Sequence, residues 1–589
     1  MHSTVAVAIR SLLIASGFLL VSPCFADAPS VGSTNVATAD PVLPPPYTTP
    51  CTVTLYSDQE FADFNSKPFT YAPPSACPGP WQKVVLSLDY SVTAGRQFDR
   101  TAEIWLGGAI VYFGTTQEPS KTNSPSWHID RDLTDLSALL AHPQTGHATL
   151  GNFVGTSGGV TYDGIIHGTA TLAFYPEAPT VFDHPPRPDV VLPISGSADG
   201  STADLTPDHP SVTVSFSSLP RNIERAFLDV YAQSQASDEF WYTCVPDDQT
   251  SNLQSCGGTA FRETEVQVDG HPAGVAPVYP WIYTGGIDPY LWRPVPGVQT
   301  LAFEAYRVDL TPFAGQLDDG ATHTVSLSVF NTQDHFSTAA NLLLYLDHSA
   351  SVVSGGVTQN TLSAAPTPSV TESADASGGT VNVTAQRQFT IAGTVATSHG
   401  PVSTTVSQNL GFSNAQTFQI NDTLYSQHIT QTTTVDSTTT VVAGATTATT
   451  HETRSYPLSM NIDYRVLPDG SANQATAVDQ RFTQSVTVGN TGFTPRTANR
   501  DDHVIAGDTL LIDANNHLTG TFDQNTQQSY TYSDPFGACY SRTVKAASDE
   551  VESVTDGQGC PNGVNRLSWF DAFANYGSSV TGATLQLLP

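Results

Sequence analysis

Short runs in which apolar and polar residues alternate, each bounded by turn-forming residues, recur from Cys51 onward and constrain the fold more than any other feature. Such alternation has the period of a strand with one buried face, and Gly, Pro, Asn and Asp end the runs. The clearest runs are 81–92, 100–115, 147–155, 167–177, 211–218, 224–234, 261–270, 323–331 and 341–349. Only 131–142 (RDLTDLSALLAH) predicts a short helix, capped by Asp132. We therefore predict an all-β protein.

The chain is too long for one hydrophobic core, because 589 residues exceed the usual size of about 150 residues per domain several-fold. A Pro- and Gly-rich joint near residue 200 and a Ser/Thr/Gly-rich break at 351–380 separate three parts. The spacing of strands and turns in the first two favours sandwiches or jelly rolls. We predict two jelly-roll-like β-sandwich units packed side by side, at 51–195 and 205–350, and a C-terminal Thr-rich β domain at 380–589.

The N-terminus has the pattern of a secretory signal. Arg10 precedes a short apolar run that ends in small residues near Ala26. We expect a cleavable signal peptide at 1–26, a Pro- and Ser-rich, poorly ordered linker at 27–50, and a secreted or periplasmic protein.

Acidic residues outnumber basic ones 54 to 22, which gives a formal charge of −32. Such a chain repels nucleic acid and anionic membranes, so neither is expected as a partner. The apolar run at the N-terminus is too short to span a membrane, and no other stretch approaches about 20 apolar residues. Few basic groups also limit self-repulsion at low pH.

Six cysteines remain after Cys24, which belongs to the signal segment, is set aside. They fall in close pairs: Cys51 with Cys77, Cys244 with Cys256, and Cys539 with Cys560. Six cysteines allow about 15 connectivities, of which pairing between neighbours is the simplest in an oxidising compartment. A zinc site is the alternative, but no C-x-x-C motif is present. No H-E-x-x-H and no complete calcium loop occurs either, so we expect no metal and no cofactor.

Acids, arginines and tryptophans recur together at strand ends in both predicted sandwiches. One at a time, such residues are more often structural, but together they predict a groove where the two units meet. Tryptophan faces stack on sugar rings, and two carboxyl groups can perform acid–base chemistry. The residues are Asp99, Arg100, Glu118, Trp127, Asp238, Glu239, Trp241, Asp288, Trp292 and Arg293.

Several of these motifs resemble the peptide N-glycosidase A family. The resemblance is carried by FDRTAEIWLGG, TTQEP, DEFWY, YTGGIDPYLWRP, DLTPFAGQLDDG and NLLLYLD, and by the late stretch IAGTVATSHGPVSTTVSQNLGFSN. It runs from about Cys51 to the C-terminus. The first two units also resemble, more distantly, PNGase F. That likeness implies two eight-stranded jelly rolls with the active site at their interface.

The same resemblance implies which residues act. FDR matches a W-D-R motif at Asp99, and E-F-W-Y-T-C places Glu239 in a second catalytic position, with one residue inserted before the tryptophan. Trp292 and Arg293 correspond loosely to a later Trp and Arg. Asn152 stands where a further acid is expected, and Glu118 is the candidate to replace that acid.

The implied reaction is hydrolysis of the amide between the innermost N-acetylglucosamine of an N-glycan and an asparagine side chain, which leaves aspartate. Asp99 would activate water or attack directly, Arg293 or Arg100 would stabilise the oxyanion, and Glu239 would orient the sugar or donate a proton. The expected substrate-binding residues are Arg100, Glu118, Trp127, Asp238, Trp241, Trp292 and Arg293.

We expect a monomer that acts on N-glycopeptides and glycoproteins, with an acidic pH optimum. Two alternatives remain open at this point: a secreted carbohydrate-binding or adhesion module, and a glycoside hydrolase that uses the same carboxylates.

Overall fold

Strands make up most of the chain, as the alternating pattern predicts. The computed structural model describes residues 29–177 and 186–567. Within these residues every helix is a single short turn, so the all-β prediction is confirmed. The expected signal peptide at 1–26 lies outside the described residues. The short helices are η1 Thr134–Leu136, α1 Ser137–Leu140, η2 Ala236–Asp238, η3 Trp241–Thr243, η4 Asp247–Gln249, α2 Thr250–Leu253, η5 Pro289–Trp292, η6 Thr311–Phe313, α3 Ala314–Leu317 and η7 Pro561–Gly563.

The first part of the chain folds into two four-stranded antiparallel sheets. One has the order β1 (Cys51–Phe61), β10 (Ile166–Pro176), β3 (Trp81–Val92), β6 (Ser126–Asp132). The other has the order β2 (Lys67–Tyr71), β7 (Gln144–Leu150), β4 (Thr101–Leu106), β5 (Ala109–Thr115). A small hairpin of β8 (Gly155–Ser157) and β9 (Val160–Tyr162) projects beside them. Apolar side chains of both sheets form one buried cluster between them.

The second part repeats this construction. One sheet has the order β11 (Val190–Ile194), β19 (His335–Leu346), β14 (Ile223–Gln235), β17 (Tyr306–Asp309), with β12 (Ala203–Leu205) also paired to β19. The facing sheet has the order β13 (Ser211–Phe216), β18 (His323–Phe330), β15 (Glu263–Val268), β16 (His271–Pro277).

Both parts share one strand order. If β8, β9 and β12 are set aside and the strands of each part are counted along the chain, one sheet runs first, eighth, third, sixth and the other second, seventh, fourth, fifth. This arrangement is a jelly roll. The prediction of jelly-roll-like sandwiches agrees with this topology.

The segment predicted as a helix is partly strand. β6 continues through Asp132, and only η1 and α1 follow it. The N-cap residue is Leu133, which has no capping side-chain bond, so the prediction of Asp132 as the cap is wrong; Asp132 Oδ1 still accepts the Thr134 N–H at 2.8 Å. Leu136, Leu139 and Leu140 are buried. Helical geometry is thus limited to η1 and α1.

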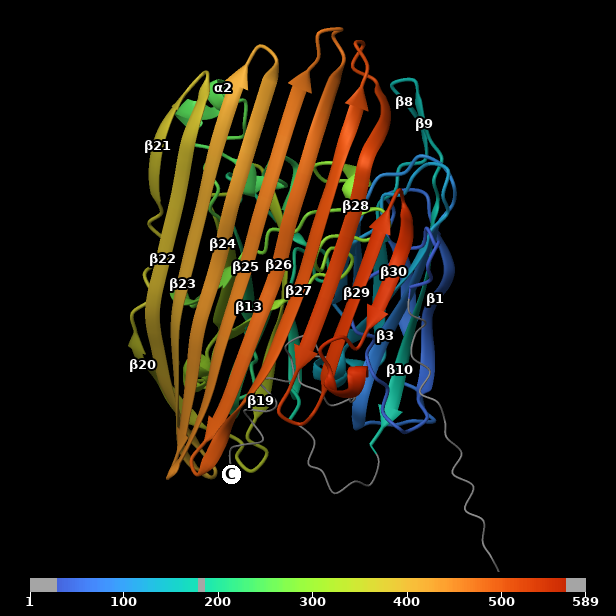
Figure 1. Ribbon diagram of the computed structural model, residues 1–589. Coiled ribbons are helices and arrows are strands. Elements are labelled where there is room, and N and C mark those ends of the chain that lie inside the picture. The colour runs from blue at the N-terminus through green and yellow to red at the C-terminus, as the bar shows by residue number, and fades with distance from the viewer. Residues whose placement is uncertain (1–28, 178–185, 568–589) are drawn as a thin grey trace, which may run out of the picture.

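A third sheet of long strands lies in front of the sandwiches in Figure 1, coloured from yellow to red. Its strands from β22 to β27 each contain 19 to 22 residues. The segment predicted as a break at 351–380 contributes two strands to it, β20 and β21. In order, the sheet contains β20 (Ser354–Asn360), β22 (Gly378–Thr397), β23 (Gly400–Asn421), β24 (Leu424–Ala443), β25 (Thr446–Val466), β26 (Ala472–Asn490), β27 (Phe493–Ile512), β28 (Leu518–Ser533), β29 (Cys539–Ala547) and β30 (Glu550–Asp556), with β21 (Ser369–Asp375) also paired to β22.

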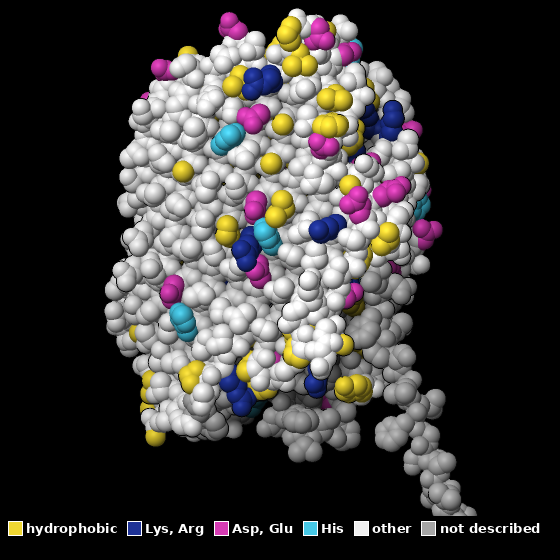
Figure 2. All heavy atoms as spheres, viewed as in Figure 1, with side chains coloured by type: hydrophobic (Ala, Val, Ile, Leu, Met, Phe, Trp, Pro, Cys, Tyr) yellow, Lys and Arg dark blue, Asp and Glu magenta, His cyan; other side chains and the backbone are white. Residues whose placement is uncertain are grey.

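The two faces of this third sheet differ. Along β22 and β23 buried residues alternate with exposed or half-buried ones, as expected for a sheet with one covered face. Figure 2 looks onto the outer face, where neutral polar side chains and backbone, drawn white, cover most of the surface. The Thr-rich sequence therefore builds a neutral polar outer face and a covered inner face.

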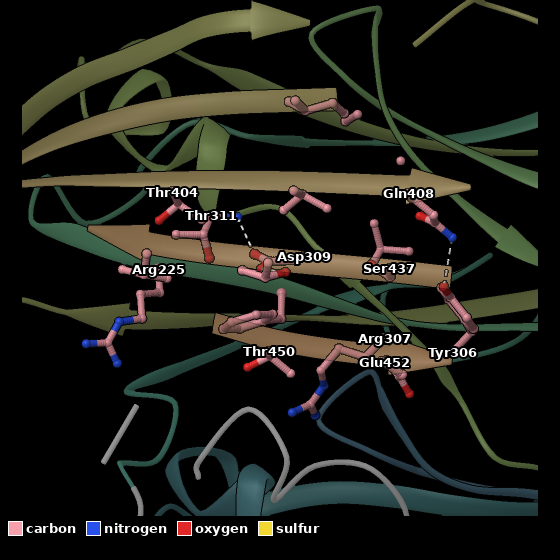
Figure 3. A pocket seen from close by; sticks show the side chains of 18 of the residues that line it. Arg225, Tyr306, Arg307, Asp309, Thr311, Thr404, Gln408, Ser437, Thr450 and Glu452 are labelled. Atoms are coloured by element: carbon pink, nitrogen blue, oxygen red, sulfur yellow. Dashed lines mark hydrogen bonds between the residues drawn. The ribbon is translucent and has the colours of Figure 1, made fainter. Parts of the chain in front are cut away.

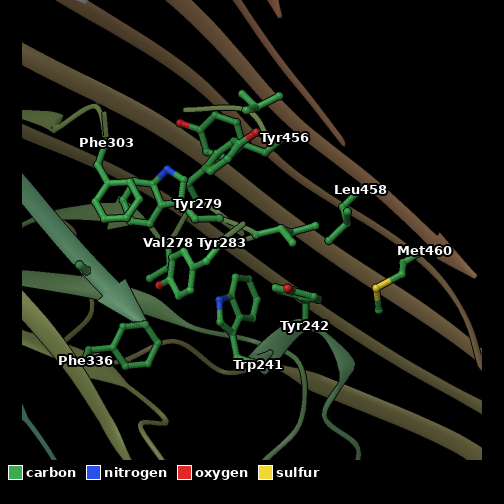
Figure 4. Packing of buried hydrophobic residues seen from close by; sticks show 14 of the residues in the cluster. Trp241, Tyr242, Val278, Tyr279, Tyr283, Phe303, Phe336, Tyr456, Leu458 and Met460 are labelled. Carbon is green, nitrogen blue, oxygen red and sulfur yellow. The ribbon is translucent and has the colours of Figure 1, made fainter. Parts of the chain in front are cut away.

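Side chains from all three parts meet in one buried cluster. It includes Phe113 of the first jelly roll, Trp241 and Trp281 from loops of the second, and Phe412 and Phe482 from the third sheet. Figure 4 shows side chains of the long strands packed toward Trp241, Tyr242 and the neighbouring tyrosines. The loops at 236–262 and 278–305 are therefore enclosed between the sandwiches and the third sheet.

Three disulfides lie in the described residues, and each joins neighbouring cysteines as predicted. They are Cys51–Cys77, Cys244–Cys256 and Cys539–Cys560. The second closes the loop after β14. A zinc site built from these cysteines is thereby excluded.

The segment before β1 is more firmly held than the expected linker. Its described part has no helix or strand, yet Ala37 and Ala39 are buried against the third sheet. Gln528 Nε2 donates to both Asp40 Oδ1 (3.0 Å) and Asp502 Oδ1 (2.9 Å). Burial, and next the charge of Glu304, raise the pKa of Asp40 to about 6. Polar contacts therefore tie the start of the chain to strands near its end.

None of the helices in the described residues is long and apolar enough to cross a lipid bilayer.

Candidate active site

Asp99 lies just before β4, at the end of the first jelly roll that faces the second. The N–H of Gly285, in a loop of the second jelly roll, donates to Asp99 Oδ2 at 3.0 Å. Burial raises the pKa of Asp99, while the Gly285 N–H and the charge of Arg100 oppose that rise. The Asp99 carboxyl group of the first jelly roll thus contacts the backbone of the second.

Glu118 follows β5 and lies beside Asp99. Its N–H donates to Thr284 Oγ1 at 2.7 Å, and its Oε2 is 3.4 Å from the Asp99 N–H nitrogen, which donates to it. Burial, and next the charge of Asp99, raise the pKa of Glu118 to about 7. The structure therefore brings together two acids that the sequence proposed separately.

Arg293 reaches this pair from the loop before β17. Its Nε donates to Glu118 O at 2.9 Å, and its Nη2 is 3.9 Å from Glu118 Oε1. Its guanidinium carbon lies 4.5 Å from the centre of the Tyr290 ring. Arg293 is largely buried, so it offers a fixed positive charge beside the acids.

Glu239 lies between η2 and η3 and is half-buried. Burial, and next the charge of Asp99, raise the pKa of Glu239 to about 7. Asp99 is therefore the carboxyl group whose charge acts on both Glu118 and Glu239. The three acids form one electrostatic group at the junction of the two jelly rolls.

Gly285 lies against Asp99 and Glu118, although it was not among the site residues predicted from the sequence. A Cβ atom at this position would lie 2.5 Å from Glu118 Oε2 and 2.8 Å from Asp99 Oδ1. Any side chain here would push the two acids apart. The Gly-Gly pair in YTGGIDPYLWRP was the available signal, because a glycine in a loop often marks a close approach of the backbone.

Asp238 does not join the site, contrary to the expectation that it binds substrate. Its side chain and that of Arg262 are both 0% exposed, and Arg262 Nη2 donates to Asp238 Oδ1 at 2.8 Å. Asp238 Oδ2 accepts the N–H groups of Gln333 and Asp334. With its oxygens occupied by the protein, Asp238 anchors the turn that carries Glu239.

The three tryptophans expected to line a sugar-binding groove are buried instead. Trp127 packs on Tyr90 in the first jelly roll, with 5.6 Å between ring centres. Trp241 lies in the junction cluster near Phe412 (Figure 4), and Trp292 donates its Nε1–H to Gly286 O. Aromatic residues at strand ends here fill the core between parts of the molecule, so none of the three presents a face to a ligand.

Arg100 and Asn152 have different roles. Arg100 is half-buried next to Asp99, and its guanidinium carbon lies 5.5 Å from the ring centre of the exposed Phe98. Asn152 is fully buried, and its Nδ2 donates to Phe61 O and Gly164 O. Asn152 is therefore structural, whereas Arg100 is partly exposed beside Asp99.

One group of His and acidic residues in the described chain has metal-like spacing, and it is formed by Glu224, Asp347 and His399, whose ligand atoms lie within 4.8 Å of one another. None of these residues belongs to the predicted site. The Asp347 oxygens already accept hydrogen bonds from Ser349 and Ser398. This group therefore reads as an ion-pair cluster between the second jelly roll and the third sheet.

A cavity of about 110 Å³ lies between β17 and the strands of the third sheet (Figure 3). Its polar groups are paired within the protein, as Tyr306 is with Gln408 and Asp309 with Thr311. None of the predicted site residues lines it. We therefore interpret the cavity as imperfect packing between the second jelly roll and the third sheet. The acids around Asp99 remain the candidate site.

Asp99 and Glu118 beside the Gly285 N–H, with Glu239 close enough to feel the charge of Asp99, give the site its chemical capacity. A carboxylate can activate water, and a protonated carboxyl can donate to a leaving group. Burial raises the pKa of all three acids, and Arg293 and Arg100 are positive groups beside them.

Comparison with known families gives matches over two segments. Residues 41–363 match the family "Peptide N-acetyl-beta-D-glucosaminyl asparaginase amidase A". Residues 380–458 match the "PNGase_A C-terminal domain".

Among curated proteins, the chain is similar to "Peptide-N4-(N-acetyl-beta-glucosaminyl)asparagine amidase A" of Prunus dulcis, with 30% identity over 390 residues. The match covers 63% of this chain and 67% of the Prunus dulcis protein.

Two solved structures are also similar. Recombinant PNGase F matches with a TM-score of 0.33 and 12% identity, over 51% of this chain and 96% of its own. PNGF-II matches with a TM-score of 0.33 and 11% identity, over 51% of this chain and 66% of its own.

Proposed function

Because this chain belongs to the peptide N-acetyl-β-D-glucosaminyl asparaginase amidase A family and is thus a peptide-N-glycosidase, we propose that it hydrolyses the amide between the innermost N-acetylglucosamine and the asparagine side chain of N-glycopeptides. The glycan leaves as a glycosylamine and the peptide keeps an aspartate. The family resemblance of the sequence motifs is confirmed by these matches.

The convergence of Asp99, Glu118 and Glu239 carries the proposal. Amide hydrolysis requires an activated water, stabilisation of the oxyanion and a proton for the leaving nitrogen. We assign the ionised role to Asp99, because the Gly285 N–H and the charge of Arg100 favour its carboxylate against the rise in pKa that burial causes. Glu118 and Glu239, each with a pKa near 7, keep their protons at acidic pH.

The proposed reaction assigns one step to each group. Asp99 accepts a proton from water while the water oxygen bonds to the amide carbon. Arg100 or Arg293 compensates the negative charge that develops on the carbonyl oxygen. The carbon–nitrogen bond then breaks as the nitrogen takes a proton from Glu239 or Glu118. Glu118 contacts Asp99 directly, and Glu239 belongs to the second jelly roll.

Export belongs to the proposal as well. The apolar run before Ala26 supports a signal peptide, and three disulfides suit an oxidising compartment. N-glycoproteins and N-glycopeptides outside the cytoplasm are the proposed substrates.

The product of the reaction tests this function directly. A denatured glycoprotein digested in water enriched in heavy oxygen should yield peptides in which the former glycosylated asparagine is an aspartate with one heavy oxygen. Mass spectrometry of the peptides measures this. A peptide that keeps one sugar would indicate a glycoside hydrolase, and an unchanged glycopeptide would indicate a binding module; either result contradicts the proposal.

We expect activity to fall as the pH rises through about 7. The proton donor must be protonated, and the pKa values of Glu118 and Glu239 are raised to about 7, so the donor form is present below that pH and lost above it. The profile of kcat against pH on a glycopeptide measures this, with circular dichroism at each pH as the control for folding. A kcat that stays constant to pH 9 in a folded protein would exclude a carboxylic acid as donor.

A further inference from the structure

The inner face of the third sheet carries polar side chains where an apolar layer is usual. Six of them are each at most 5% exposed and bind the backbone of the loops that hold Glu239 and Arg293: Asn414, Gln416, Gln427, Gln480, Gln524 and Thr526. We propose that these are positioning residues, which hold the two loops in the geometry that the reaction requires. This inference rests on the proposed function.

The first group lies under the loop after Glu239. Asn414 and Gln416 of β23 and Gln427 of β24 donate to three consecutive carbonyl groups, at residues 242–244. The bonds run from Asn414 Nδ2 to Tyr242 O (2.9 Å), from Gln427 Nε2 to Thr243 O (3.1 Å) and from Gln416 Nε2 to Cys244 O (3.0 Å).

These amides also orient one another. Gln427 Nε2 donates to Gln416 Oε1 at 2.8 Å, and Gln416 Nε2 donates to Asn414 Oδ1 at 3.0 Å. Asn414 Nδ2 in turn donates to Gln431 Oε1 at 2.9 Å. The NH₂ group of each of these three amides therefore donates to one loop carbonyl and to one neighbouring amide, which fixes its direction. A buried network of this kind favours one arrangement of the backbone above it.

The second group lies under the loop that carries Gly285 and Arg293. Gln524 Nε2 donates to both Tyr290 O (2.9 Å) and Arg293 O (2.8 Å). The Asp549 N–H donates to Gln524 Oε1, which fixes the direction of this amide. In addition, Thr526 Oγ1 donates to Leu291 O (2.6 Å), and Gln480 binds Pro280 O and the Val298 N–H.

A short chain of contacts connects the second group to the acids. Gln524 holds the Arg293 carbonyl, Arg293 Nε holds the Glu118 carbonyl, and Glu118 Oε2 accepts the Asp99 N–H. The same loop supplies the Gly285 N–H to Asp99. Packing of apolar residues would hold this loop without fixing its rotation, whereas hydrogen bonds to successive carbonyls are directional. The third sheet thus acts on the reaction through the loop backbone.

Gln524→Leu is the direct test, because leucine has a similar size and cannot donate. Gln527→Leu is the matched control: Gln527 is on the same strand, β28, but points to the other face. We expect kcat of Gln524→Leu to fall about tenfold or more, with KM changed much less, since a loop displaced by a fraction of an ångström misplaces the reacting groups. Gln527→Leu should match the wild type.

A double-substitution cycle separates positioning from general loss of stability. If Gln524 acts through Arg293, then Gln524→Leu should have little further effect on kcat in an Arg293→Met background. Thr526→Val, with exposed Thr531→Val as its control, is the gentler variant should Gln524→Leu not fold. Hydrogen exchange at the amides of residues 286–293 is measured in the same proteins and should be faster only in the inward-facing variants.

The outcomes are distinct. A wild-type protein that releases no glycan overturns the proposed function, and hydrogen exchange then decides alone whether the sheet holds the loop. Wild-type-like kcat and exchange in both Gln524→Leu and Thr526→Val overturn the positioning role. An undiminished effect of Gln524→Leu in the Arg293→Met background also overturns the path through Arg293.

Discussion

Asp99→Asn should lower kcat by about 10²- to 10⁴-fold, the usual contribution of a general base. Asparagine keeps the size of the side chain and an oxygen that can accept the Gly285 N–H, so the loop contact at 3.0 Å should persist. Only the ionisable group is lost. Single-turnover rates on a glycopeptide measure the effect.

The stability of this variant provides an independent check. Burial raises the pKa of Asp99, so the ionised carboxyl is disfavoured in the folded state. An acid of this kind reduces stability as the pH rises above its ordinary pKa, and the neutral asparagine removes that effect. Asp99→Asn should therefore be at least as stable as the wild type at pH 7 to 8. The control is Asp89→Asn on the exposed side of β3. An active Asp99→Asn enzyme would exclude Asp99 from the reaction.

Asp238→Asn should lower the free energy of unfolding by about 3–5 kcal/mol, because it leaves the charge of Arg262 buried without a counter-ion. Both side chains of this pair are 0% exposed. Chemical denaturation at neutral pH measures the loss. Turnover should also fall, since the next residue along the chain is Glu239.

Two further variants give this prediction its controls. Asp248→Asn, at an exposed position in the same loop, should be neutral. The double variant Asp238→Asn with Arg262→Met removes both charges and keeps an oxygen for the N–H groups of Gln333 and Asp334, so it should recover much of the stability. A loss below about 1 kcal/mol for Asp238→Asn would show that water or another group reaches Arg262.

Most strands could be predicted because each depends on a pattern of residues that are neighbours in the sequence. Alternation in segments such as 167–177 follows from one buried face, and the structure has β10 there. The pairing of neighbouring cysteines was predictable for the same reason. The two strands at 354–375 were missed, because their Ser, Thr and Gly content resembles a linker and only pairing with the long β22 makes them strands.

The site was predictable only in part. Family resemblance indicated Asp99, Glu239 and Arg293, but residue type alone could not separate Glu239 from its neighbour Asp238. One of these adjacent acids is half-exposed and the other is fully buried by Arg262. Burial depends on contacts between distant segments, which is also why the predicted tryptophan groove became core and why Gly285 was not singled out.

The support of the site by the third sheet also determines the order in which the molecule can mature. Ribosomes deliver domains from the N-terminus onward, and early domains fold as units while later residues are still being made. Both jelly rolls are complete before β28 exists, but the Leu291 carbonyl binds Thr526, 235 residues further along the chain. The segment before β1 gains its contact with the third sheet even later after its own synthesis, since the Ala39 N–H donates to Gln528, 489 residues further along the chain. Contacts of such sequence separation form slowly. We therefore expect the catalytic loops to become ordered among the last elements of the fold, so that a growing chain already contains every acid of the site but lacks a working enzyme until its final strands arrive.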